Sequence, residues 1–81
     1  MQNVSKAIAL RLKQLLKERG ITMYRLEQNM GLSHETLKSI VKGKTRGVNL
    51  KTVIVIAEGL SMTVSEFLDS ELFNYSNLNL E

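Results

Sequence analysis

The chain has 81 residues and a net charge of +3, and 43% of its residues are hydrophobic but only 5% aromatic. This length allows one small domain, whose core has to come from aliphatic side chains. Without cysteine and with a single histidine, neither a disulfide nor a metal site nor a nucleophile–base pair is easily assembled. The longest apolar run, residues 53–57, cannot span a bilayer, and basic residues interrupt the apolar N-terminus. We therefore expect a soluble, cytoplasmic protein that is not an enzyme and needs no cofactor.

The spacing of the apolar residues predicts an all-α fold. Proline is absent, and the longer apolar segments follow a helical rather than an alternating period. A first helix is expected from about Ser5 to Arg19, because one side of this segment is apolar and Gly20 follows it. The side chains expected to face inward are Ile8, Leu12, Leu15 and Leu16.

Residues 21–43 predict two short helices joined by a tight turn. Thr22 can cap the first of them, over about residues 23–29, because its hydroxyl can accept a backbone N–H one turn further on. Gly31 can adopt the left-handed conformation that ends a helix at little cost.

Ser33 is placed to cap the next helix, over about residues 34–42. Its apolar stripe has the i, i+3, i+4 spacing of a buried helix face and consists of Leu37, Ile40 and Val41. Two helices this short, with a glycine in the turn between them, are typical of the helix-turn-helix unit.

After a basic loop at residues 43–48, Asn49 is expected to cap a fourth helix. The β-branched run at residues 53–56 also fits a strand, but the flanking caps and the helical spacing favour a helix. The apolar face predicted for it consists of Leu50, Val53, Ile54, Ala57 and Leu60, widened by Val55 and Ile56. A fifth helix, capped by Thr63 or Ser65, would turn its apolar residues inward, namely Phe67, Leu68 and Leu72.

The sequence changes character after residue 72, which divides it into a domain at residues 1–72 and a tail at residues 73–81. The tail has three asparagines, which are poor helix formers, and apolar side chains at residues 73, 75, 78 and 80. It could be a frayed end, or it could pack on its own domain or on a second subunit. Alternation at Leu78 and Leu80 favours a short extended strand that pairs with the same tail of a second subunit.

The charge is divided unevenly along the chain. Residues 1–51 carry all 11 basic residues and three acidic ones, a balance of +8, whereas residues 52–81 carry five acidic residues and no basic one. The cationic part contains the two short helices at residues 21–43, as binding to a polyanion would require. An ordinary solvated surface with a chance imbalance is the alternative interpretation.

Taken in order, these elements resemble the DNA-binding domain of phage repressor and Cro proteins, also called the Xre family. The resemblance covers about Ala7 to Leu72, and its pieces are individually weak but specific as an ordered series. They are Leu-x-x-Leu-Leu at residues 12–16, Gly-Leu-Ser at 31–33, Gly-Lys-Thr at 43–45, Leu-Lys-Thr at 50–52 and Gly-Leu-Ser-Met-Thr-Val-Ser-Glu-Phe-Leu at 59–68. The resemblance implies a five-helix repressor-like domain with the helix-turn-helix at its second and third helices.

The resemblance also implies that the third helix presents its N-terminal residues to base edges in the major groove. The positions carried over are His34, Glu35 and Ser39, with Lys38 close by. His34 can donate to guanine, Glu35 can accept from the cytosine amine, and Ser39 can do either. Glu35 fits a first-turn acid favoured by the helix dipole equally well, and His34 fits a solvated surface residue.

Phosphate contacts would position the motif without reading sequence. At the start of the second helix, backbone N–H groups near Thr22 and Met23 are candidates. Many relatives have glutamine at the position of Met23, so a side-chain contact is lost there. The other candidates follow the third helix and are Lys42, Lys44, Thr45 and Arg46.

A second departure from the family concerns an ion pair between the first and third helices. Many members have arginine at the position of Leu16 and glutamate at that of Val41, and here both are aliphatic. Since packed apolar groups often replace a buried ion pair without loss of stability, the joint change leaves the expected fold intact.

We therefore expect a transcriptional regulator that binds double-stranded DNA by sequence and acts by operator occupancy. A homodimer is expected, because one short helix reads too few base pairs to be selective. No second domain is evident, so no small-molecule ligand is expected, and an antitoxin or a phage control protein is compatible with these features. The rival is a protein-interaction adaptor that uses the fourth helix and the tail, although an adaptor has no need of the basic residues at 42–46.

Overall fold

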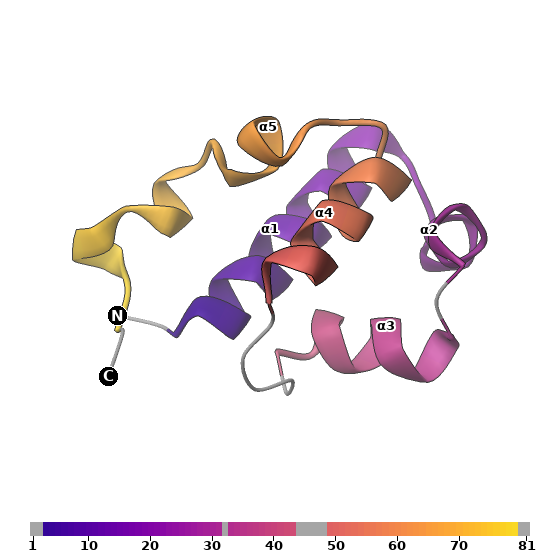
Figure 1. The fold of residues 1–81 in the computed structure, drawn as a ribbon, viewed down its shortest axis with the longest axis horizontal. Coiled ribbons are helices and arrows are strands. Elements are labelled where there is room, and N and C mark those ends of the chain that lie inside the picture. The colour runs from indigo at the N-terminus through magenta and orange to yellow at the C-terminus, as the bar shows by residue number, and fades with distance from the viewer. Residues whose placement is uncertain (1–2, 32, 44–48, 80–81) are drawn as a thin grey trace.

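The computed structural model describes residues 3–31, 33–43 and 49–79. Over these residues the chain forms five α-helices and then two short 3₁₀ turns (Figure 1). The helices are α1 (Val4–Arg19), α2 (Met23–Met30), α3 (His34–Val41), α4 (Leu50–Gly59) and α5 (Val64–Leu68), and the turns are η1 (Glu71–Phe73) and η2 (Tyr75–Asn77). The predicted all-α fold with five helices is confirmed.

Each α-helix begins at a polar residue whose side chain accepts a backbone N–H three residues further on. These N-caps are Asn3, Thr22, Ser33, Asn49 and Thr63. The last four had been predicted from the sequence, with Thr63 as one of two candidates, and Asn3 explains why α1 begins one residue earlier than expected. Gly20 and Gly31 end α1 and α2 with φ angles of 63° and 68°, in the left-handed region where glycine is least strained.

The cap of α5 is reciprocal, because Glu66 also accepts the backbone N–H of Thr63 at 3.0 Å. This backbone hydrogen bond, together with the Thr63 hydroxyl, holds the pKa of the Glu66 carboxyl below its ordinary value. A helix of only five residues is thus fixed at its first turn by two mutual hydrogen bonds.

A single, mostly aliphatic core joins all five helices. Its buried members are Ile8, Leu12, Leu15, Leu26, Leu37, Ile40, Val53, Ile56, Ala57, Leu60, Met62 and Phe67. Helix α1 packs against α3, while α4 packs against α2 and α5, so α1 and α4 together hold the outer helices in place (Figure 1). Leu16 and Val41, which stand where many relatives have an ion pair, both pack against this core.

Two parts of the predicted core lie at the surface instead. On α4, Leu50 is 63% exposed and Ile54 is 47% exposed. At 100° per residue, Leu50 lies about 120° and Ile54 about 160° around the helix from the fully buried Ile56. On α5, Phe67 is fully buried while the adjacent Leu68 is 37% exposed, because consecutive residues of a helix cannot face the same side.

Arg11 of α1 forms hydrogen bonds to the C-terminal part of the chain. Its Nε donates to the carbonyl oxygen of Phe67 at 2.7 Å, and its Nη2 donates to that of Glu66 at 2.9 Å. Arg19 likewise donates from Nη1 to the carbonyl oxygen of Leu60, at 3.0 Å, near the end of α4. Two of the basic residues therefore hold carbonyls at helix ends that would otherwise need water.

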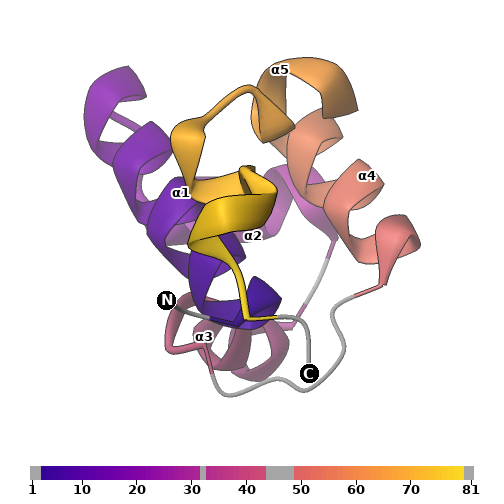
Figure 2. The same ribbon diagram turned by 90° about the vertical axis from the view of Figure 1, so that its left-hand side faces the viewer.

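The beginning of the predicted tail packs on its own domain. Phe73 packs against the core, with its ring centroid 6.2 Å from that of Phe67, and the segment runs beside α1 (Figure 2). The tail is not extended throughout, because it forms η2 before the backbone becomes extended at Leu78. Tyr75 in this turn is 83% exposed.

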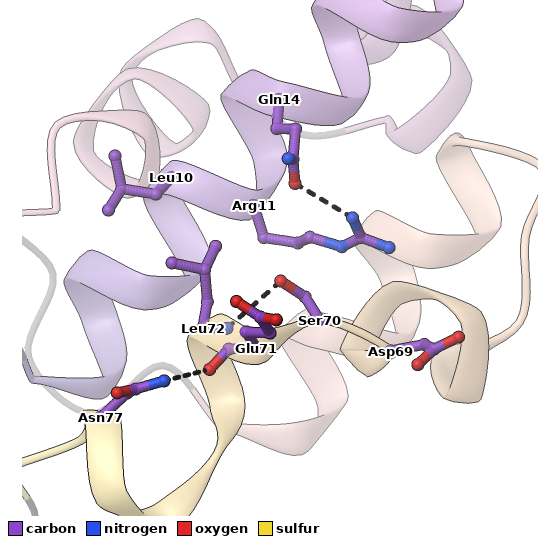
Figure 3. Close-up of a pocket in the computed structure, with 8 residues that line it drawn as sticks. All are labelled: Leu10, Arg11, Gln14, Asp69, Ser70, Glu71, Leu72 and Asn77. Carbon is purple, nitrogen blue, oxygen red and sulfur yellow. Dashed lines mark hydrogen bonds between the residues drawn. The ribbon is translucent and has the colours of Figure 1, made fainter.

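A cleft of about 960 Å³ separates α1 from the segment at residues 69–77 (Figure 3). Arg11 lies in it but is already bonded to backbone carbonyls and to Gln14. On the opposite wall, the side chain of Asn77 donates to the carbonyl oxygen of Glu71 at 2.8 Å. These hydrogen bonds hold α5 against α1 and join η2 to η1.

We predict that Gly59→Ala destabilises the fold although alanine is the better helix former. A methyl group at this position would overlap Cγ of the Met30 side chain and lie 3.0 Å from Cδ1 of Leu26, so these side chains would have to shift or α2 and α4 to separate. After the gain in helix propensity, the expected loss is roughly 1–2 kcal/mol of unfolding free energy. Chemical denaturation would measure it, with exposed Glu58→Ala as the control. Unchanged stability would mean that α2 and α4 tolerate a wider separation.

Candidate nucleic-acid interface

Helices α2 and α3 form a helix-turn-helix unit on the face of the domain made by α1 and α4. Leu26 of α2 and Leu37 of α3 are both fully buried in the core. In Figure 1, α2 is seen nearly end-on while α3 lies in the plane of the view, so the two helices cross at a steep angle. Burial on the inner side of each helix leaves the outer side of α3 facing solvent.

Three of the four predicted base-reading residues lie at this outer surface. His34, Glu35 and Lys38 are exposed, whereas Ser39 is half-buried. Since residues four apart lie above one another on a helix, His34 and Lys38 form one ridge, with Glu35 and Ser39 beside it. The structure thus places the four residues on one polar side of α3, opposite its buried Leu37 and Ile40.

The structure also shows a contact that sequence analysis did not identify. The carboxylate of Glu27, on α2, pairs with Nδ1 of His34, the first residue of α3. The side chain of His34 is 64% exposed while that of Glu27 is only 14% exposed. A separation of seven residues across a turn has no characteristic spacing, so only the crossing of α2 and α3 could reveal this pair.

The structure describes only some of the residues that are predicted to contact phosphates. Thr22 is exposed and its hydroxyl accepts the N–H of Arg25 at 3.1 Å, while Met23 packs its side chain against the core. Only the backbone of Met23 can therefore face a phosphate. Lys42 is exposed at the end of α3. The other three candidates, Lys44, Thr45 and Arg46, lie outside the described residues.

The basic and acidic residues that are separated along the sequence are also separated in space. Helix α3 lies at the bottom of Figure 1 and α5 at the top. Lys38 and Lys42 are exposed at the α3 end, and Glu66 and Asp69 are exposed at the α5 end. Because Arg11 and Arg19 bind helix carbonyls, part of the basic half of the sequence is structural. The cationic character at α3 comes instead from exposed lysines.

Within the part of the chain that the structure describes, there is neither a metal-binding cluster nor a membrane-spanning helix. Within residues 3–31, 33–43 and 49–79, no three histidine, cysteine or acidic side chains gather as they would to hold a metal ion. No helix among them has the length and apolar character needed to cross a membrane.

A family model for the Cro/C1-type HTH DNA-binding domain matches residues 11–71. The chain belongs to the Cro/C1-type helix-turn-helix family. The match begins within α1, spans α2 and α3 and ends in η1, and it supports DNA binding by this domain. No curated protein and no solved structure gives a significant match to the chain.

Proposed function

We propose that this Cro/C1-type protein regulates transcription by binding a specific double-stranded DNA operator and occupying it. The observation that carries the proposal is the outer side of α3, where His34, Glu35 and Lys38 are exposed on a helix held by the buried Leu37. This arrangement suits a helix that enters the major groove with its N-terminal residues toward the bases. Its proposed site of action is the cytoplasm.

In this proposal the residues act in two groups. His34, Glu35, Lys38 and Ser39 read bases. Phosphates are bound by the backbone at Thr22 and Met23 and by residues after α3, namely Lys42, Lys44, Thr45 and Arg46. The steep crossing of α2 and α3 supports this division, because the start of α2 and the end of α3 would flank the groove that α3 enters.

The protein is further proposed to act as a homodimer. A helix of eight residues contacts too few base pairs for selectivity, and two copies on paired half-sites double the sequence that is read. The exposed Tyr75 is the large apolar side chain of the tail that could contact a second subunit, whereas Leu78 is half-buried on its own domain.

A protein-interaction adaptor, or an antitoxin-type module on the same fold, is the second candidate function. The observation that favours it is the pair Leu50 and Ile54, which lie one turn apart on α4 and are 63% and 47% exposed. Such a pair can contribute to a protein interface, but it is small beside the apolar patches that usually mark one.

We predict a strong salt dependence of DNA affinity, because Lys42 and the basic residues after it would release counterions from phosphates. With about four phosphate contacts per subunit, log K should fall against log salt with a slope of about −7 per dimer. Fluorescence anisotropy on a duplex over a range of salt concentrations would measure this. A slope near zero, or no binding at low salt, would contradict the proposed function.

Variants of the proposed phosphate-binding residues and of the proposed base-reading residues should affect DNA binding in different ways. Lys44→Ala and Arg46→Ala should weaken binding to cognate and random duplexes alike, whereas His34→Ala and Ser39→Ala should change which sequence is preferred. Each lost base contact should cost roughly 1–3 kcal/mol of discrimination. Selection of bound oligonucleotides would check this, and an unchanged preference in the α3 variants would refute the assignment.

Truncation after Phe73 should lower the dimer population and the operator affinity. The shortened chain keeps the contact between Phe73 and Phe67 but loses η2 and Leu78, so its five α-helices should remain folded. Analytical ultracentrifugation of both chains at one concentration would measure the masses, with circular dichroism as the control for folding. Equal masses would restrict the tail to packing on its own domain.

A further inference from the structure

We propose that Glu27 is a specificity-determining residue, which sets the hydrogen-bonding character of His34 toward the base that His34 reads. The inference rests on the proposed function and deepens it. Glu27 would not touch DNA. It would act through His34, by deciding which ring nitrogen carries a proton.

The structure fixes the carboxylate of Glu27 beside the ring of His34. Glu27 follows the fully buried Leu26 on α2, and its backbone carbonyl accepts the N–H of Gly31 at 2.9 Å, so its position is fixed by the helix and by the turn. Its carboxylate pairs with Nδ1 of His34 and is largely shielded from solvent, with 14% of the side chain exposed. The His34 ring is therefore oriented by a group on a different helix from its own.

The pairing determines what the other ring nitrogen can do. An ionised carboxylate only accepts hydrogen bonds, so Nδ1 of His34 must carry the hydrogen, and in the neutral ring Nε2 is then an acceptor. Nothing in residues 3–31, 33–43 and 49–79 is seen to bond to Nε2. The ring is 64% exposed, which leaves this nitrogen available to a ligand.

An acceptor at Nε2 selects a different base from the one expected from the sequence. In the major groove, adenine N6 and cytosine N4 are the donors, whereas guanine offers only acceptors at N7 and O6. A neutral His34 ring fixed by Glu27 would therefore read the amino group of adenine or cytosine. A ring free to carry its hydrogen on Nε2, or an imidazolium, would donate to guanine instead.

The first test needs no DNA. Because the chain has a single histidine, the ¹⁵N resonances of its imidazole can be recorded without ambiguity. We expect the wild-type ring to carry its hydrogen on Nδ1 and to lose that preference in Glu27→Ala. A wild-type ring protonated on Nε2, or a tautomer that Glu27→Ala leaves unchanged, would overturn the proposal.

The second test measures base preference by selection of bound oligonucleotides. Wild type should favour adenine or cytosine at one operator position by roughly tenfold, and Glu27→Ala should lose this preference at that position alone. In a His34→Ala background, adding Glu27→Ala should change nothing further, because the glutamate acts only through the ring. Exposed Glu58→Ala on α4 removes the same charge from elsewhere in the domain and should leave every position unchanged.

The outcomes separate this proposal from the proposed function. A wild-type protein that selects a sequence but whose preferences survive Glu27→Ala, or that prefers guanine at the His34 position, refutes only the role of Glu27. An equal effect of Glu27→Ala with and without His34 would make it a structural residue. A wild-type protein that enriches no sequence would overturn the proposed function and the readout with it.

Discussion

Burial of aliphatic side chains in one shared core is the constraint on which the rest of this structure depends. Helices of eight residues, such as α2 and α3, are too short to be stable alone in water. They persist because Leu26 and Leu37 are fully buried in the cluster that Leu12 of α1 and Ile56 of α4 also enter. With 81 residues the core is small, and α2 and α4 pack so closely at Gly59 that a side chain there would meet Met30 and Leu26.

Hydrogen bonds at the helix ends add to the packing of the core in holding the helices together. Arg11 and Arg19 donate to carbonyls near the ends of α5 and α4, and so fix the C-terminal helices to α1. Charge counted along the sequence therefore overstates the charge available to a polyanion. The lysines that remain exposed at α3, Lys38 and Lys42, lie at the opposite end of the domain from the exposed acids of α5 and the segment after it. This separation would orient the domain as it approaches DNA.

The surface of α3 depends on the same packing, because the crossing of α2 and α3 brings Glu27 to His34. Under the proposed function, a side chain that reads bases needs a fixed orientation, and the carboxylate of Glu27 on the neighbouring helix would fix that of His34. Packing also decides which apolar residues stay at the surface. Leu50 and Ile54 are hydrophobic but exposed, because they lie outside the buried stripe of α4.

The sequence by itself determined the elements of this fold. Caps such as Ser33 and Asn49, the glycine that ends α2, and the apolar period of α3 are local signals, and each predicted its helix to within about two residues. The series of motifs at family spacing also identified the helix-turn-helix family. Only the tertiary structure decided which side of α4 is buried, which arginines are structural, and that Glu27 meets His34. These depend on how helices cross, and crossing is set by the packing of side chains far apart in the sequence, which no local period encodes.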